Sequence, residues 1–427
     1  MLTLLRQRNF ALLWFAGLIS LIGDWMLMIG LPIYVFLLTH SALATSLMFI
    51  AGILPQIALG SVAGVFVDRW DRKRVMIITN VSLAVCLLPL LMFHSVSWLW
   101  VVYIVAFLES LISQFFAPAE SALLPRLVDE EHLASANSVS SLNGNLARLI
   151  GPPLGGIVAG LLGLNGIALL DAASFIIAAG LITLITVNAQ PVKKQASVAA
   201  NVKTNPWRNV WHEWLEGLRL VKQERNVAAM FALIAITSLG EGVFAVLIIA
   251  YVSNVLHGGA LQLGWLQGAQ AVGGLIGGLL IGFVVKKVSL SHLIGFGAIA
   301  FGIIDLLIFN YPTFFPGIVI GLALFVLVGI PGVGFSTGVT TLLQMSVEDE
   351  YRGRIFGAMG TTSALLMLLG TTLAGFLADP LGVVTVLNTQ GGMYVLAGFC
   401  VLILLRPAVI NETEQIERDV VELERVH

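Results

Sequence analysis

The sequence predicts an all-α integral membrane protein in which twelve transmembrane helices form two pseudo-symmetric bundles of six. Hydrophobic residues make up 58% of the 427 residues and charged residues only 11%, whereas about 25% of the residues of a soluble domain are charged. Apolar stretches long enough to cross a bilayer recur along the chain, and the second half repeats features of the first. The net charge of −2 argues against a nucleic-acid partner.

The spans follow from hydropathy, because a helix needs about 20 apolar residues to cross the hydrocarbon core of a bilayer. Twelve stretches separated by short polar interruptions meet this requirement. They lie near residues 11–38, 43–67, 75–93, 98–118, 136–162, 166–187, 227–254, 261–285, 290–309, 313–335, 354–378 and 383–405. The first stretch follows Arg6 and Arg8, as in a signal peptide, but it is too long for one and is predicted to be the first span.

Positively charged residues orient the chain, since Lys and Arg concentrate in cytoplasmic loops. Every Lys and Arg except Arg148 lies in a terminal segment or in a connection on one side, and the opposite connections contain none. Both termini are therefore predicted to be cytoplasmic. Arg148 falls within the fifth span.

The longest connection divides the spans into two sets of six. We expect an N-terminal bundle, a cytoplasmic linker, a C-terminal bundle and a charged cytoplasmic tail, over residues 1–187, 188–226, 227–405 and 406–427. In the linker, apolar residues from Trp207 to Val221 follow helical spacing with charged residues between them. This pattern predicts an amphipathic helix at the membrane surface, with a solvated linker as the alternative.

An internal repeat relates the two halves. At an offset of 219 residues, the glycine-rich stretch 151–156 falls on the stretch 370–375. Asp24 in the first span and Glu241 in the seventh lie at matching depth. Parallel repeats of this kind place the substrate near the middle of the bilayer, between the halves.

The connection after the second span contains a motif with a glycine, an Asp-Arg pair and a basic cluster. It runs Gly64-Val-Phe-Val-Asp68-Arg69-Trp-Asp71-Arg72-Lys73-Arg74. This stretch resembles the signature loop of the major facilitator superfamily of transporters, except that Asp71 stands where that loop usually has a second glycine. The resemblance implies the twelve-helix fold of that superfamily and a conformational gate formed by Gly64, Asp68, Arg69 and Arg72.

Electrostatics gives Asp68 a reason to act as a latch. It ends the second span at the face where the eleventh span begins, near Gly353. A carboxylate near a helix N-terminus is favoured by about 0.3–1 kcal/mol when exposed, and such a contact can form in one conformation and break in another. The alternative is that these charges only set the topology.

The fifth span contains a second motif, Gly151-Pro152-Pro153-Leu154-Gly155-Gly156. It resembles the Gly-Pro-x-x-Gly-Gly pattern that marks the antiporters of the superfamily, which implies export. Small residues let helices approach closely, and a proline kinks a helix. We expect a tightly packed fifth span that seals one side of a cavity, with packing alone as the alternative.

Further short matches resemble the drug-efflux branch of the superfamily, with its macrolide efflux pumps and siderophore exporters. They include Gly23-Asp24-Trp25, Ala147-Arg148 and Arg352-Gly-Arg-Ile-Phe356. The arginine that many members carry in the fourth span is missing, and we infer that Arg148 takes its place. This resemblance implies a multi-pass protein of the bacterial cytoplasmic (inner) membrane.

Charged residues inside spans are functional candidates, because a charged side chain at the bilayer centre costs about 2.5–3.5 kcal/mol. Asp24, Glu109 and Glu241 lie deepest, and Arg148 is expected to pair with Glu109 or Asp24. We predict that these four residues form the proton-coupling and substrate site. A fixed salt bridge that only specifies helix packing is the alternative.

Other residues near this site receive weaker predictions. Trp25 and Phe116 are candidates for an adaptable, apolar cavity wall. Asp171 and Asp305 lie near the outer ends of their spans, so we expect them to be hydrated or to cap helices.

The predicted function is secondary active transport, in which amphiphilic compounds such as macrolides leave the cell in exchange for protons by alternating access. The chain has no Gly-x-x-x-x-Gly-Lys-Ser/Thr phosphate loop, and we expect no catalytic residues, cofactor, metal or obligate protein partner. Its expected partners are the small substrate, protons and membrane lipids. A siderophore exporter or lysophospholipid transporter of the same fold is the main alternative; a membrane enzyme or channel has less support.

Overall fold

The computed structural model describes residues 4–59, 63–67, 69–186, 225–284, 288–347 and 349–405. The regular structure of this part of the chain is helical, which confirms the predicted fold class. Eleven helical stretches are long and apolar enough to cross a membrane. One of them, Glu130–Thr183, covers the fifth and sixth predicted spans. The two spans meet at Gly163, whose φ of 64° and ψ of −164° interrupt the helix and suit glycine, which has no Cβ.

The helices fall into two groups along the chain. The first group is α1 (Arg8–Thr39), α2 (Ala42–Leu59), α3 (Ala63–Val67), α4 (Arg72–Leu87), α5 (Leu99–Ser113), α6 (Phe116–Leu123) and α7 (Leu133–Thr183). The second group is α9 (Arg225–Asn254), α10 (Ala260–Val284), α11 (Leu290–Asn310), α12 (Ile318–Ser346), α13 (Asp349–Leu381) and α14 (Val383–Leu404). Short 3₁₀ helices are η1 (Leu4–Arg6), η2 (Leu88–Met92), η3 (Val96–Trp98), η4 (Leu124–Arg126), η5 (Glu130–His132) and η7 (Tyr311–Thr313).

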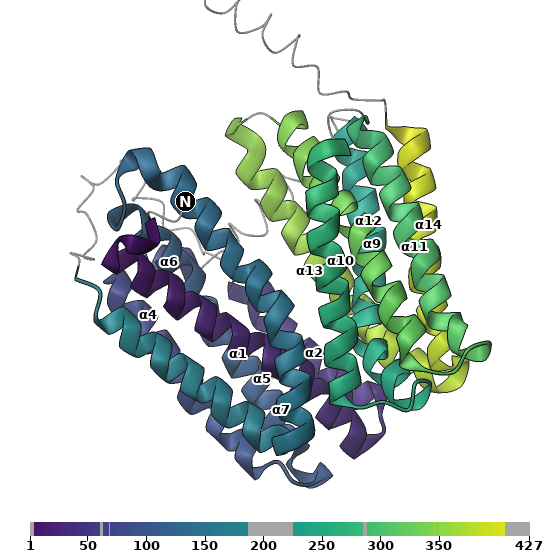
Figure 1. Ribbon diagram of the computed structural model, residues 1–427, viewed down its shortest axis with the longest axis horizontal. Helices are drawn as coiled ribbons and strands as arrows, with labels where there is room; N and C mark the ends of the chain where they lie inside the picture. The colour runs from purple at the N-terminus through teal and green to yellow at the C-terminus, as the bar shows by residue number, and fades with distance from the viewer. Residues whose placement is uncertain are drawn as a thin grey trace, which may run out of the picture.

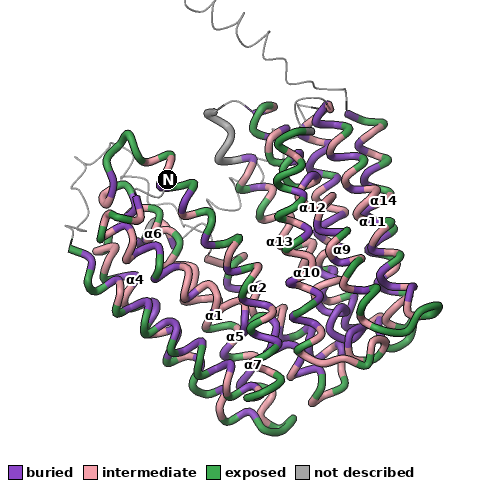
Figure 2. Tube along the Cα trace, in the orientation of Figure 1, coloured by how far each residue is buried: buried purple, intermediate pink, exposed green. Residues whose placement is uncertain are grey.

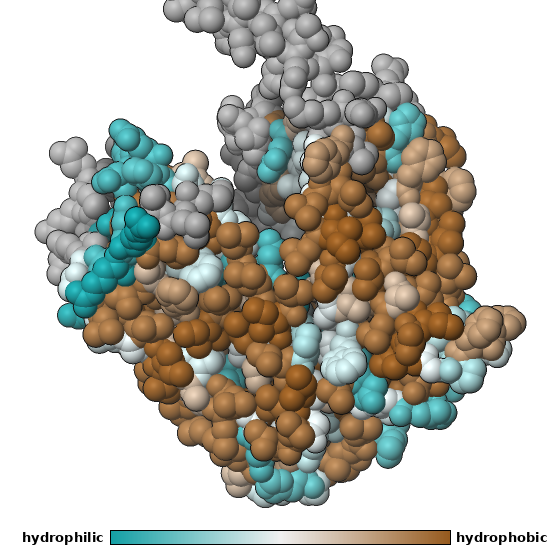
Figure 3. Space-filling view, viewed as in Figure 1, coloured by the Kyte–Doolittle hydropathy of each residue, from teal (hydrophilic) through white to brown (hydrophobic). Residues whose placement is uncertain are grey.

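Figure 1 shows the first group, purple to teal, beside the second, green to yellow. Of the expected linker, only the last two residues, which begin α9, belong to the described part. The predicted amphipathic helix and the tail lie outside the described residues. Apolar side chains cover most of the visible surface of both groups (Figure 3), as expected of helices that face lipid.

Asp71 begins α4 as its N-cap. Its backbone is extended, and its Oδ1 accepts a hydrogen bond of 2.9 Å from the backbone N–H of Arg74. The residue that departs from the family pattern therefore satisfies one of the free N–H groups at the start of this helix.

Replacing Asp71 by Ala is expected to reduce stability by about 0.5–2 kcal/mol, because the Arg74 N–H loses its acceptor. Asp71→Asn keeps a side-chain oxygen and is the matched control. Thermal unfolding in detergent measures the difference. Equal midpoints for the Ala and Asn variants would contradict the capping role.

The two groups meet mainly through two crossings, of α7 with α10 and of α2 with α13. At the first, a Cβ atom on Gly156 would lie 3.1 Å from the Cα of Leu261; at the second, a Cβ atom on Gly375 would lie 3.2 Å from the Cα of Leu43. Gly156 and Gly375 are equivalent in the repeat. The same small residue therefore permits a close helix crossing in each half.

Both crossings lie at the end of the molecule where α2 and α10 begin, which we call the closed end. One hydrophobic core here contains residues of both groups, among them Phe36 of α1, Tyr251 of α9 and Ala374 of α13. Figure 2 shows many buried positions around α9 and α10 in this region.

The opposite end, where Arg8 and Leu404 lie, is the open end. Figure 1 shows the groups diverging toward it. Each group has a hydrophobic core of its own there, one around Phe10 and Met76 and the other around Ile294 and Leu343. The two groups thus share a core at the closed end and pack around separate cores at the open end.

Candidate functional site

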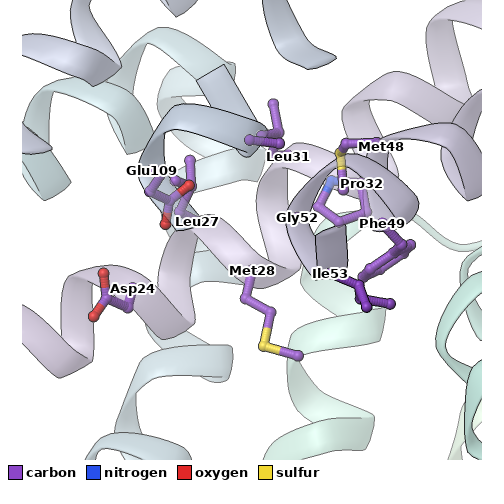
Figure 4. Close-up of a pocket in the computed structure, with 11 residues that line it drawn as sticks. Asp24, Leu27, Met28, Leu31, Pro32, Met48, Phe49, Gly52, Ile53 and Glu109 are labelled. Atoms are coloured by element: carbon purple, nitrogen blue, oxygen red, sulfur yellow. The ribbon is translucent and has the colours of Figure 1, made fainter. Parts of the chain in front are cut away.

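A cavity of about 340 Å³ lies between α1, α2 and α5. This volume is at the lower end of the range for small-molecule sites. Most of its wall is apolar, and two carboxyl groups, those of Asp24 and Glu109, are its charged members. Figure 4 shows the two acids on one side of the cavity, away from Phe49 and Ile53. The lining residues are Asp24, Leu27, Met28, Leu31, Pro32, Met48, Phe49, Gly52, Ile53, Ala106 and Glu109.

The backbone makes room for this cavity. Gly52 of α2 has no atom within 4 Å of the position a Cβ would occupy, so its lack of a side chain leaves open space. Pro32 of α1 also lines the wall and, having no N–H, leaves one carbonyl of α1 without its helical partner. Met28 and Met48 add flexible, polarisable side chains that adapt to ligands of different shape.

A third acid, Asp171 of α7, stands close behind the cavity. It is fully buried; one carboxyl oxygen accepts a 3.2 Å hydrogen bond from the Ser174 hydroxyl, and the other has no hydrogen-bond partner in the described chain. The charges of Asp24 and Glu109 act on it. Like charges this close disfavour the state in which all three acids are ionised.

Arg148 does not form the expected ion pair with Asp24 or Glu109 within the described residues, and its side chain is exposed. The reason is helical phase. Ala147, Gly151 and Gly155 recur every four residues and are buried; Gly151 and Gly155 contact α1. Arg148 follows Ala147 by one residue, so its side chain does not lie on the face that packs against α1. Its charge acts on Glu241 of the other group.

The second group has a polar network around Glu241 of α9. Glu241 Oε1 accepts a hydrogen bond from the Tyr394 hydroxyl on α14. One turn earlier on α14, Gln390 donates a 2.7 Å hydrogen bond to Asp305 on α11. The Tyr394 ring is held by Phe301, with centroids 4.5 Å apart, and by Phe335.

Two expectations about depth are wrong. Asp171 is 0% exposed and Asp305 2% exposed, so neither is hydrated, and neither caps a helix. Both lie inside helix bundles, because distance from a span end says nothing about which side of a helix faces protein. Tyr394 and Gln390 were not identified from the sequence. The repeat offset of 219 residues, which places Asp171 on Gln390, is a signal that could have identified the second of them.

The glycine-proline motif lies where three helices meet. Gly151 packs against the side chain of Trp25, and a Cβ atom on Gly155 would lie 2.8 Å from the Cα of Met26. Pro152 and Gly156 face α10 at its crossing with α7. Trp25 therefore supports helix packing and does not line the cavity.

The other predicted residues lie toward the open end. Phe116 packs in the core of the first group around Phe10 and also does not line the cavity. Gly64 is half-buried and Arg69 exposed, and Arg72 has buried guanidinium nitrogens without a hydrogen-bond partner in the described chain. Asp68 lies outside the described residues, so the gate stays a prediction.

Comparisons with known proteins agree on the family. Residues 1–426 match the family described as transmembrane secretion effector, a major facilitator family. The chain is 28% identical to macrolide efflux protein A of Streptococcus pyogenes over 381 residues, 88% of this chain and 90% of that protein. It is 27% identical to the multidrug efflux pump Tap of Mycolicibacterium fortuitum over 381 residues, 87% of this chain and 89% of that protein.

A staphyloferrin A transporter of Staphylococcus aureus is 24% identical over 373 residues, 87% of this chain and 89% of that protein. Among solved structures, the nucleoside transporter NupG superposes with a TM-score of 0.72 at 13% identity, over 93% of this chain and 100% of that chain. The family consists of transporters and not of enzymes. The chain belongs to the transmembrane secretion effector family of major facilitator transporters.

Proposed function

We propose that this transporter exports amphiphilic, often cationic compounds of the macrolide and multidrug type in exchange for protons. The observation that carries the proposal is the pair of acids, Asp24 and Glu109, in a cavity whose wall is otherwise mostly apolar. An apolar wall favours binding of a hydrophobic substrate, and the acids attract either a cationic group or protons. The similarity to macrolide efflux protein A and to a multidrug efflux pump supports this substrate class.

Transport follows from alternating access. With the termini in the cytoplasm, the open end faces the cytoplasm, and substrate enters the space between the groups from there. Substrate that binds at Asp24 and Glu109 displaces protons. The groups then rock, so that the shared core at the closed end opens and the open end closes. Gly64, Asp68, Arg69 and Arg72 are proposed to stabilise the closure of the cytoplasmic side.

We propose that Arg148 and Glu241 respond to this motion through a change in the distance between them. They lie on different groups, and the Arg148 charge already acts on Glu241 in this conformation. Closure at the cytoplasmic side changes their separation, and with it the preference of Glu241 for its charged form.

A second candidate keeps the fold and changes the cargo to a siderophore or a lysophospholipid. The similarity to a staphyloferrin A transporter supports keeping it. The two acids of the cavity distinguish the two candidate cargoes, because they favour binding of a cation over binding of an anionic ligand.

The test is reconstitution in liposomes with an imposed pH gradient and a pH-sensitive dye inside. Erythromycin, tetraphenylphosphonium and the anionic lysolipid lysophosphatidylglycerol are added in turn. We expect proton movement with the first two and none in protein-free vesicles. If only the lysolipid drives proton movement, the proposed cargo is wrong and a lysolipid replaces it. If none of the three probes drives proton movement, the proposal of proton-coupled drug export is wrong.

A further inference from the structure

The polar network of the second group contains a buried acid that the proposed site does not use. Asp305 of α11 is 2% exposed and Gln390 of α14 is 1% exposed, and they are joined by the 2.7 Å bond from Gln390 Nε2 to Asp305 Oδ2. The amide oxygen of the same side chain, Gln390 Oε1, is buried without a hydrogen-bond partner in the described chain.

Among the described residues, the groups that face Asp305 do not supply a positive charge. α11 packs against α12, α14 and η7, and η7 carries the phenol of Tyr311. α12 carries no titratable side chain, and α14 carries Tyr394 and Cys400. Across the bundle, Glu241 of α9 acts on Asp305 with a like charge. On α11 itself His292 is 13 residues away, about 20 Å along the helix.

A neighbouring pair on the same helices shows what a neutral contact looks like. Asn310 of α11 and Asn388 of α14 exchange two hydrogen bonds, of 2.7 Å and 3.3 Å, so each amide both donates and accepts. Within the described structure, the Asp305–Gln390 pair has one hydrogen bond. A proton on Asp305 would supply the O–H donor that Gln390 Oε1 lacks and would make this pair reciprocal too.

We propose that Asp305, which accepts a hydrogen bond from Gln390, is a second proton-binding residue of the transport cycle behind Glu241; this inference rests on the proposed proton-coupled export. An unpaired carboxylate in an apolar interior is costly, so Asp305 holds a proton in the present conformation. Glu241, which is half-buried, exchanges protons with the opening between the groups. A proton that passes from Asp305 to Glu241 leaves the total charge of the two acids unchanged.

Tyr394 is placed to couple the two acids. Its hydroxyl donates to Glu241, and the charges of both Glu241 and Asp305 act on it. The rings of Phe301 and Phe335 fix its orientation. It is therefore a positioning residue for the pair.

Asp305→Asn is the test variant, because the asparagine oxygen still accepts from Gln390 Nε2 and its amide gives Gln390 Oε1 a donor. Asn388→Ala is the matched control, because it breaks a polar contact between the same two helices without removing a titratable group. Infrared spectra of the purified proteins at acid and alkaline pH report the carbonyl band of protonated carboxyl groups. We expect Asp305→Asn to lose one component of this band and Asn388→Ala to keep it. An unchanged band in Asp305→Asn would overturn the proposal.

Transport in liposomes supplies the second readout. With tetraphenylphosphonium, Asp305→Asn is expected to lose proton movement and to keep exchange of labelled for unlabelled probe, whereas Asn388→Ala keeps both. Proton movement per probe equal to that of the unmodified protein would overturn the role of Asp305 in the cycle. An unmodified protein that moves no protons would instead refute the proposed function, and the infrared comparison would still show whether Asp305 binds a proton.

Discussion

Glu109→Gln is expected to abolish proton movement driven by a cationic substrate and to leave the protein folded. Glutamine has nearly the same shape but cannot release a proton at this position in the cavity. It also removes the negative charge that attracts the cation, so the affinity for tetraphenylphosphonium should fall about tenfold to 150-fold. Neutral amphiphiles should lose much less affinity, since their binding depends on the apolar wall.

The measurement is the liposome assay with the pH-sensitive dye, together with equilibrium binding of the labelled cation in detergent. Asp379→Asn is the matched control, because Asp379 is an exposed acid of α13 that lies outside the cavity. Its coupling should equal that of the unmodified protein. If Glu109→Gln retains full coupling, Glu109 does not carry the exchanged proton, and Asp24 becomes the remaining candidate in the cavity.

Hydropathy predicted the helical framework because each span must satisfy its own backbone hydrogen bonds in lipid. The limits of α9 and α14 in the structure differ from the predicted spans by only one or two residues. The junction of the fifth and sixth spans near Gly163 also followed from the sequence. What hydropathy missed there is that one glycine makes the turn, without a separate polar loop.

The orientation of side chains around each helix was harder to predict. Depth along a span follows from counting residues, and it predicted that Asp24 and Glu109 lie deep. Lateral position depends on which helices are neighbours, and a single sequence does not contain this information directly. For this reason Arg148 was expected beside Glu109, although its neighbours Ala147 and Gly151 occupy the face that packs against α1.

Neutral polar residues gave the weakest signal. The free energies of transferring Gln390 and Tyr394 into a membrane are too small to mark these residues within α14. Both nevertheless donate hydrogen bonds to the acids of the second group, Gln390 to Asp305 and Tyr394 to Glu241. The buried Asp305 was visible, but its position four residues from the predicted end of its span suggested hydration. Only the packing of α11 between α12 and α14 shows that water is excluded from it.

Gly264→Leu is expected to shift the transporter away from the present conformation. Gly264 of α10 lies in the crossing with α7, where a Cβ atom would contact the Pro152 carbonyl and lie 3.1 Å from the Cα of Gly156. These neighbours are backbone atoms and cannot move aside as a flexible side chain can. Overpacking of this kind costs about 1–3 kcal/mol. If only the conformation closed at this end bears the cost, the equilibrium shifts about fivefold to 150-fold toward the opposite one.

Gly278→Leu is the matched control, because it makes the same change on the same helix at a position with no atom within 4 Å of the added Cβ. Spin labels at Val96 and Phe314, in a background without Cys86 and Cys400, measure the separation of the two groups at the closed end. Both labelled positions are exposed and belong to different groups.

The distance between these labels should increase in Gly264→Leu and stay unchanged in Gly278→Leu. Because the closed end has one core shared by both groups and the open end has two separate cores, a wedge at Gly264 disturbs contacts that exist only in this conformation. The same variant should therefore bind tetraphenylphosphonium more weakly from the open end while keeping Asp24 and Glu109 intact. An unchanged label distance would mean that the α7–α10 crossing persists throughout the cycle, and the movement between the groups would then have to pivot on it.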